Sequence, residues 1–216
     1  MRTTVSYNSE VSVLARCVAA LRFGLAAAVF VLACAGAASA DIWVIDKSAS
    51  VITFTYDHFG LSRQGGRFGN LEGTLEFSPT EPQAGAVDVT VRSAAISTGV
   101  GELDQLLKSA DFFNAQRYPT INFKSTGIRK IDERQGEVDG ELTMLGVTLP
   151  VTLQVTWNYT GEYPLSSINP VYQGKWVSGF SAKTVIERSR WGMKRGIPLL
   201  SDEIAITIEV EFLKAD

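Results

Sequence analysis

Alternation of apolar and polar residues over long segments is the feature that most constrains this chain. In residues 203–212, five apolar side chains share one face of an extended strand: Ile204, Ile206, Ile208, Val210 and Phe212. Residues 51–59 alternate in the same way, with Ile52, Phe54, Tyr56 and His58 on one face. Because side chains on a strand point alternately to its two faces, the pattern indicates a half-buried antiparallel sheet.

Similar segments recur at hairpin spacing along the chain. They are residues 71–77, 87–91, 121–123, 138–144, 149–159 and 176–186, which makes about eight strands in all. A two-sheet sandwich shows similar alternation. An open sheet, however, leaves its edges unpaired, and the first and last strands here are both long and apolar on one face. We therefore expect an all-β fold, an extended eight-stranded antiparallel β-barrel.

One amphipathic helix is predicted between the third and fourth strands. In residues 101–111, Leu103, Leu106, Leu107 and Ala110 recur at spacings of three and four and form one apolar stripe. A helix in a long barrel connection is expected to cover one end of the barrel. Whether it only plugs the core or also gates access stays open.

The first 40 residues resemble a signal peptide. Arg2, Arg16 and Arg22 precede a small, apolar stretch over residues 23–37, and Ala38-Ser39-Ala40 fits the small-x-small cleavage pattern. We expect cleavage after Ala40 and a periplasmic protein made of residues 41–216. An uncleaved anchor, or a lipoprotein acylated at Cys34, are alternatives.

The remaining composition excludes several function classes. Both cysteines, Cys17 and Cys34, lie before the expected cleavage site, so residues 41–216 contain no disulfide and no thiolate. The leader contains three of the 20 basic and one of the 23 acidic residues, which leaves a net charge of about −5. That total favours neither nucleic acid nor an anionic membrane surface as a partner.

Catalytic chemistry has few residues to draw on. His58 is the single histidine, and no G-x-S-x-G elbow accompanies it. Zinc sites draw on several His or Cys ligands. We expect no enzyme activity, no cofactor and no metal site, with a lipid hydrolase that uses His58 as an alternative.

The inward faces are rich in aromatic and aliphatic side chains, which suits an apolar ligand. Candidate lining residues are Phe54, Tyr56, His58, Phe123, Leu142, Met144, Leu153, Val155, Trp157, Trp176, Phe180 and Ile206. Small residues on the same faces, such as Gly73 and Gly140, would leave room for a channel. Eight-stranded barrels either hold one small ligand or are filled by their own side chains, so a filled barrel with a structural or interaction role is the alternative.

A basic cluster precedes the last strand, at one barrel end. It consists of Arg188, Arg190, Lys194 and Arg195. These side chains would hold an anionic headgroup through charge-assisted hydrogen bonds, or belong to a solvated loop.

Five sequence blocks, in order, resemble the YceI-like family, also called polyisoprenoid-binding-like. The blocks are W-V-I-D with S-V-I-T-F (43–54), H-F-G with G-R-F (58–68), L-K-S-A-D-F-F-N-A-Q-R-Y-P-T-I-N-F (107–123), G-E-L-T-M-L-G-V-T-L-P-V (140–151) and the segment 188–204. The resemblance covers residues 41–212. It implies a lipocalin-like barrel whose channel takes a long isoprenoid or similar amphiphile, such as a polyprenyl phosphate or a quinone. It also implies a periplasmic location, and it is compatible with a homodimer and an inner-membrane partner protein.

Four positions depart from the family pattern. Ala49 stands where a histidine commonly precedes the serine of the first strand. The helix has Leu103 and Leu106 in place of the arginine and histidine of an R-D-x-H-L pattern, and Leu149 replaces a lysine. These changes remove two histidines and two cations, so they suggest a less polar ligand or a different specificity within the family.

Overall fold

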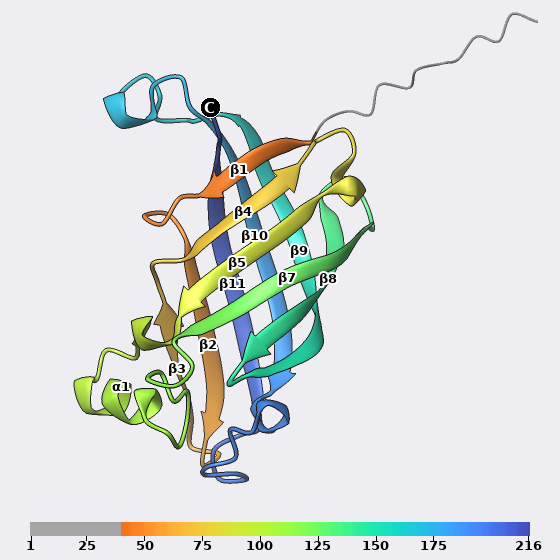
Figure 1. The fold of residues 1–216 in the computed structure, drawn as a ribbon. Helices are drawn as coiled ribbons and strands as arrows, with labels where there is room; N and C mark the ends of the chain where they lie inside the picture. Colours follow the sequence, from red (N-terminus) through yellow and green to blue (C-terminus); the bar gives the residue numbers. More distant parts are fainter. Residues whose placement is uncertain (1–39) are drawn as a thin grey trace, which may run out of the picture. The chain divides into compact units, whose positions relative to one another are not determined.

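Eleven strands, one α-helix and four short 3-10 helices form the part of the chain described by the computed structural model, residues 40–216 (Figure 1). The strands are β1 (Asp41–Ile45), β2 (Val51–His58), β3 (Ser62–Phe68), β4 (Glu72–Phe77), β5 (Ala86–Arg92), β6 (Ile96–Ser97), β7 (Thr120–Lys130), β8 (Gln135–Met144), β9 (Val147–Glu162), β10 (Trp176–Glu187) and β11 (Glu203–Lys214). The helices are α1 (Gly101–Lys108), η1 (Pro82–Ala84), η2 (Ser93–Ala95), η3 (Pro170–Tyr172) and η4 (Arg188–Trp191). The expected signal peptide and the alternative acylation site at Cys34 lie outside the described residues, apart from Ala40.

Eight strands close into a barrel. Their order is β1-β4-β5-β7-β8-β9-β10-β11, and the ring closes because β11 pairs antiparallel with both β10 and β1. The all-β, eight-stranded antiparallel barrel predicted from the alternation is confirmed. In chain order α1 lies between the third and fourth strands of the ring, β5 and β7, as predicted.

The last strand exchanges partners along its second edge. It faces β2 over residues 205–209 and β1 over residues 212–214. At the break between them, Ser50 Oγ accepts a hydrogen bond from the N–H of Glu211 (3.1 Å) and donates one to the carbonyl of Glu211 (3.3 Å). The serine side chain thus gives the N–H of Glu211 a partner, while the carbonyl of Glu211 also accepts from the N–H of Asp46 (2.8 Å).

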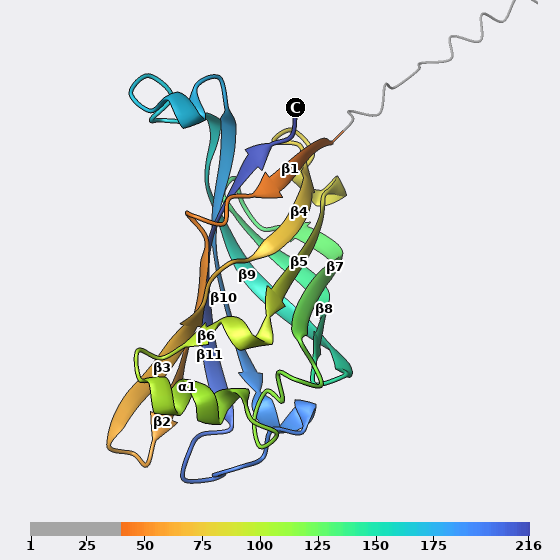
Figure 2. The same ribbon diagram turned by 60° about the vertical axis from the view of Figure 1, so that its left-hand side comes forward.

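The membership of the ring differs in one strand from the sequence prediction. Residues 41–45, which are not among the eight predicted strands, form β1 and close the barrel, with Trp43 and Ile45 buried inside it. The segment read as the first barrel strand forms β2, which with β3 and β6 extends the sheet beyond the ring (Figure 2). Five residues are too short for alternation to stand out, although Trp43 and Ile45 do alternate with exposed neighbours.

The helix lies across the end of the barrel at which β2 and β3 meet (Figures 1 and 2). Its first turn is tied to the preceding loop, because the Asp104 carboxylate accepts hydrogen bonds from the N–H (2.6 Å) and Oγ1 (2.7 Å) of Thr98. These bonds hold the pKa of Asp104 below its ordinary value. Leu107, on the side of the helix that faces the barrel, is buried. We call this the α1 end and the opposite end, at β1, the β1 end.

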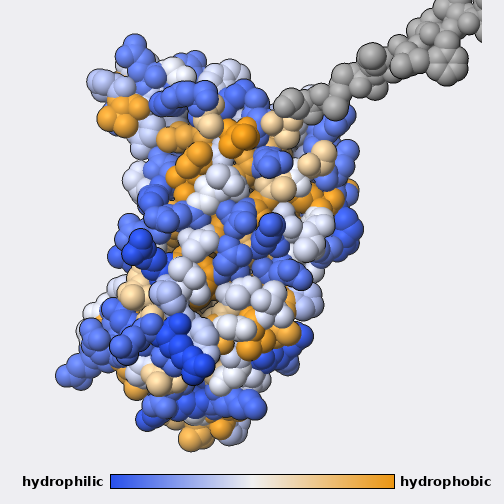
Figure 3. Space-filling view, viewed as in Figure 1, coloured by the Kyte–Doolittle hydropathy of each residue, from blue (hydrophilic) through white to orange (hydrophobic). Residues whose placement is uncertain are grey.

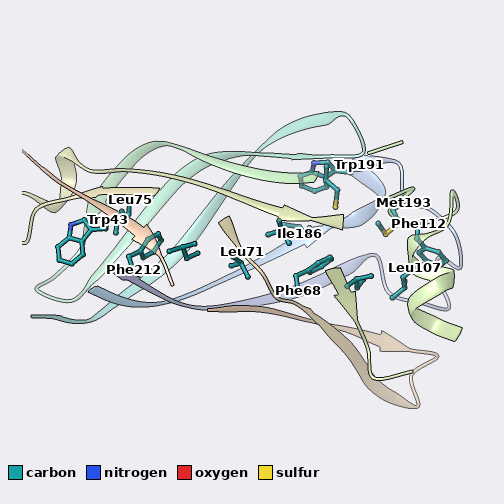
Figure 4. Packing of buried hydrophobic residues seen from close by; sticks show 14 of the residues in the cluster. Trp43, Phe68, Leu71, Leu75, Leu107, Phe112, Ile186, Trp191, Met193 and Phe212 are labelled. Carbon is teal, nitrogen blue, oxygen red and sulfur yellow. The ribbon is translucent and has the colours of Figure 1, made fainter. Parts of the chain in front are cut away.

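Buried side chains form one cluster along the barrel, from Trp43 at one end through Leu71 and Ile186 to Phe112 at the other (Figure 4). Trp43, Leu75 and Phe212 fill the β1 end, where the indole Nε1 of Trp43 donates to the carbonyl of Phe77 (3.2 Å). Phe112 and Met193 pack at the α1 end beside the helix. The site is lined in part by members of this cluster, among them Leu71, Ile186 and Phe112.

Candidate functional site

A cavity of about 600 Å³ runs inside the barrel and reaches the α1 end. Its wall comes from nearly every strand of the ring and from β2, β3 and α1. Aliphatic and aromatic side chains make up most of it. Ligand pockets in proteins typically measure 300–1,000 Å³ and are mostly apolar, so the volume and lining suit one apolar ligand.

Most of the predicted lining residues reach the cavity. They are Phe54, Tyr56, His58, Phe123, Leu142, Met144, Leu153, Val155, Phe180 and Ile206. Period-two alternation therefore identified the inner face correctly on β2, β7, β8, β9 and β11. Whether these residues bind lipid stays a prediction.

Two predicted lining residues lie elsewhere, both near the β1 end. Trp157 packs edge-on against Phe77, with ring centroids 5.4 Å apart, and its Nε1 donates to Thr160 Oγ1 (2.8 Å). Trp176 is 51% exposed at the very start of β10, opposite Glu162. Inward placement of Trp176 was wrong because the strand begins there, beyond the inner packing.

A β-bulge explains why alternation fails in this region. The pairing of β9 with β10 shifts register between Gly179 and Phe180, which oppose Tyr159 and Trp157. One extra residue, Asn158, on β9 reverses the face of everything that follows. Tyr159 is consequently exposed, whereas Thr160 turns inward and forms a hydrogen bond with Ser178 (2.6 Å).

The inward glycines make room for aromatic rings of neighbouring strands rather than for a channel. A Cβ on Gly140 would lie 2.3 Å from Cζ of Phe123, and one on Gly66 would lie 2.8 Å from Cζ of Phe54. Both distances are far below van der Waals contact. The two rings lie against bare backbone, and the cavity they line depends on the absence of a side chain there.

The polar side chains of the cavity are gathered toward the α1 end. Among its lining residues they are Tyr56, His58, Gln64, Thr184 and Arg188. Tyr56 opposes Gln64 across the β2–β3 pair, and the His58 ring contacts Phe59 edge-on at 4.2 Å between centroids. Burial raises the pKa of the Tyr56 hydroxyl, with the charge of Arg188 acting in the opposite direction, so this hydroxyl is a neutral donor at physiological pH.

Arg188 is a buried cation, 4% exposed, whose hydrogen bonds all go to main-chain carbonyls. Its Nε donates to Ser201 (2.9 Å), Nη1 to Met193 and Arg195 (2.9 Å each), and Nη2 to Leu200 (3.1 Å). Burial lowers the pKa of this guanidinium, although arginine stays charged in proteins. The nearby carboxylate of Asp202 instead accepts from the N–H and Oγ of Ser189.

The other predicted headgroup cations do not line the cavity. Arg190 is exposed in a separate groove with Pro150 and Glu203, Lys194 is exposed, and Arg195 pairs with Asp111. The turn η4 explains the difference, because residues three apart in a 3-10 helix lie on one side. Arg188 and Trp191 are both buried, whereas Arg190 faces away from them. The basic cluster thus contributes one side chain to the cavity.

The helix and the loop after it supply lining residues that no strand pattern predicts. Leu103, Leu106 and Leu107 of the apolar stripe, together with Phe112 and Phe113, face the cavity. The spacing of the leucines was the available signal. It predicted an apolar face but not what that face covers.

Two kinds of feature are absent from residues 40–216, the part of the chain that the structure describes. No group of three or more His, Cys, Asp or Glu side chains there is arranged to hold a metal ion. Within the same residues, no helix combines the length and the apolar character needed to cross a membrane.

Comparisons with known proteins agree with this geometry. A sequence profile of the YceI-like domain matches residues 43–212. Protein YceI of Escherichia coli is 34% identical over 179 residues, which covers 82% of this chain and 89% of that relative. The crystal structure of the Campylobacter jejuni YCEI protein superimposes with a TM-score of 0.64 at 29% identity, covering 74% of this chain and 90% of the other.

A more distant structure shares the fold. It is described as a polyisoprenoid binding domain from Saccharophagus degradans implicated in plant cell wall breakdown, and it is 12% identical with a TM-score of 0.55. The match covers 80% of this chain and 98% of that domain. At this identity the likeness shows the barrel fold alone.

Proposed function

This chain belongs to the YceI-like family, and on that premise we propose that it is a periplasmic binding or carrier protein for a long-chain isoprenoid or similar amphiphilic lipid. A polyprenyl phosphate and a quinone are the ligand types considered. The protein would hold the lipid without transforming it.

The observation that carries the proposal is the asymmetry of the cavity. Its wall is apolar toward the β1 end, with Leu75, Phe180 and Phe212, and carries Tyr56, Gln64 and Arg188 toward the α1 end. An amphiphile has the same asymmetry. Each CH₂ moved from water into such a wall contributes about 0.8 kcal/mol, so a long chain binds tightly with few polar contacts.

The polar end has donors to offer a headgroup. A guanidinium has five N–H groups, and Arg188 uses four of them on carbonyls, which leaves one. The neutral Tyr56 hydroxyl is a second donor. The helix contributes Leu103 and Leu106 where the family pattern has an arginine and a histidine, which favours a less polar head such as a quinone over a phosphate.

Two further observations support the lipid and its compartment. The name of the Saccharophagus degradans domain, which has the same fold, specifies polyisoprenoid binding. The first strand, β1, begins at Asp41, directly after the expected cleavage site at Ala40. Residues 41–216 therefore contain the whole ring, as an exported mature domain requires.

Filling the cavity tests the proposal. In Leu153→Trp the indole would occupy the lumen, and in the matched control Gln154→Trp the same side chain would project from the outer face of β9. We expect Leu153→Trp to lose binding of added polyprenol by at least tenfold, and Gln154→Trp to bind like the parent. Circular dichroism establishes that both variants fold. Equal polyprenol binding by parent, folded Leu153→Trp and control would contradict the proposal.

A further inference from the structure

The apolar wall of the cavity continues onto the outer surface at the α1 end. Phe59 and Leu106 both line the cavity and are exposed to solvent. Leu61 is 83% exposed and Leu199 is 63% exposed on the adjoining loops. We call these four residues the apolar rim. Figure 3 shows hydrophobic surface at this lower tip of the barrel, surrounded by hydrophilic residues.

The rim is built by a turn that a phenylalanine rarely occupies. In the β2–β3 hairpin, Phe59 and Gly60 have φ of 61° and 70°, and the N–H of Leu61 donates to the carbonyl of His58 (3.0 Å). Hairpin turns of this kind favour Asn or Gly at both central positions, because positive φ is strained for a bulky residue. Such strain persists where surrounding structure holds it, and it is concentrated at functional sites.

Neighbouring groups hold that turn in place. The Asp57 carboxylate accepts a hydrogen bond from the N–H of Gly60 (2.7 Å), and the N–H of Phe59 donates to the carbonyl of Leu199 (2.8 Å). The second bond joins the hairpin to the loop between β10 and β11. Leu61 and Leu199 are consequently presented by one connected tip rather than by two independent loops.

Positive charge accompanies the rim although the chain is acidic overall. The segment from Arg188 to Ser201, which carries Leu199, contains four basic residues and no acidic one. Arg63, on the β2–β3 hairpin, is also exposed. Of these cations, Arg188 is buried and Arg195 pairs with Asp111. Exposed Lys194 and Arg63 are therefore cations that this end offers to an anionic surface.

The hairpin between β9 and β10, at the β1 end, provides the contrast. It also exposes apolar side chains, including Ile168, which is 76% exposed. Its charges differ, because Glu162 lies at its base and Lys175 pairs with Asp216 (3.3 Å). Within residues 40–216, the α1 end is where exposed apolar tips and exposed cations lie beside the opening of the cavity.

We propose that the apolar rim docks the cavity mouth onto an anionic bilayer surface, so that a lipid passes between bilayer and barrel without crossing water. Apolar side chains inserted at the interface and nearby cations both add to attachment at an anionic membrane. The lipid-transfer part rests on the proposed function. The docking itself rests on the rim and its charges.

Vesicle flotation tests the docking. The full-length gene product, with its N-terminus determined by mass spectrometry, is mixed with vesicles of equal parts phosphatidylglycerol and phosphatidylcholine, or of phosphatidylcholine alone. We expect attachment to the anionic vesicles that weakens with added salt. Leu61→Asp should weaken it on the order of tenfold, because the substitution removes an apolar anchor and adds a negative charge. The matched control Ile168→Asp, at the β1 end, should leave it unchanged.

Several outcomes would overturn the docking. They are no attachment to anionic vesicles, equal attachment to neutral ones, or equal losses in Leu61→Asp and Ile168→Asp. Light scattering that shows a dimer in the parent and a monomer in Leu61→Asp would instead make the rim a contact between copies of the chain.

Displacement of anilinonaphthalene sulfonate by farnesol, measured without vesicles, separates this proposal from the proposed function. We expect Leu61→Asp to bind farnesol like the parent. Farnesol binding without vesicle attachment would overturn the docking alone. Vesicle attachment without farnesol binding would overturn the lipid-binding function and leave the docking in place.

Discussion

The two ends of the barrel are closed by different means. At the β1 end, side chains from the ring strands themselves fill the lumen. Trp43, Phe77 and Phe212 are buried there, on the neighbouring strands β1, β4 and β11. At the α1 end, a helix and two loops cover the opening, and several of their residues are exposed while also lining the cavity. Strand packing makes a permanent seal, whereas loops and a short helix make a cover that separates from the ring at smaller cost.

The β1 end therefore contributes mainly to the stability of the fold, and the α1 end mainly to access to the cavity. Residues at the β1 end belong to the ladder that closes the ring, so their loss weakens the whole fold. Residues at the α1 end carry the polar groups and the rim, so many of them are free to vary without unfolding the barrel. Arg188 is the exception, because it organises the loop from Met193 to Ser201 by four hydrogen bonds.

The largest expected effect comes from opening the sealed end. Trp43→Ala removes a fully buried indole and its hydrogen bond to Phe77, and we expect the free energy of unfolding to fall by about 3–5 kcal/mol. Leu106→Ala at the mouth should cost about 1 kcal/mol or less, because Leu106 is exposed. Urea unfolding measures both. Comparable losses would show that the ends are not sealed differently.

Replacing the buried arginine should produce the next largest effect. Arg188→Met leaves four buried or partly buried carbonyls without this donor, and we expect a loss of about 3 kcal/mol together with weaker retention of ligand. The control is Arg195→Met, which breaks a half-exposed ion pair with Asp111 and should cost less than about 1 kcal/mol. If the two variants unfold at the same urea concentration, Arg188 does not organise the α1 end.

The smallest effect concerns two tyrosines, one near each end. Burial raises the pKa of Tyr56, and burial together with the neighbouring Glu211 carboxylate raises that of Tyr163 further. In the unfolded chain both hydroxyls ionise near pH 10, before they do so in the folded protein. Stability is thus complete below that pH and is lost as pH rises through the folded pKa values.

Alkaline titrations of two variants measure this loss at each end. We expect Tyr163→Phe to reduce the alkaline loss of stability more than Tyr56→Phe does, with each variant removing one late phenolate transition from the ultraviolet absorbance. Unchanged titrations in both variants would contradict the assigned environments.

Sequence reasoning reached the fold because alternation survives wherever a strand stays regular. The inner faces of β2 and β11 were predicted residue by residue, from Ile52 to His58 and from Ile204 to Phe212. The alternation fails where a strand changes register or begins. The extra residue Asn158 turns Tyr159 outward although strict alternation over residues 149–159 places it inward, and Trp176 lies at the start of its strand. Alternation of apolar and polar residues does not predict where a β-bulge lies.

The site was predictable only in part, for a similar reason. The apolar lining follows from strand faces, but the choice of Arg188 over Arg190 and Arg195 depends on the turn η4. The rim depends on a hairpin that places Phe59 at positive φ, which no propensity favours. The conformation of the loops, and the placement of their charged side chains, depend on tertiary contacts that the sequence pattern does not contain.

Solvent extraction and mass spectrometry of the protein purified from a bacterial periplasm test the central claim most directly. A stoichiometric long-chain isoprenoid or quinone is the expected result, and it would also identify the ligand. Protein that carries no lipid and takes up no added polyprenol would contradict the claim. The barrel would then serve a structural or partner-binding role.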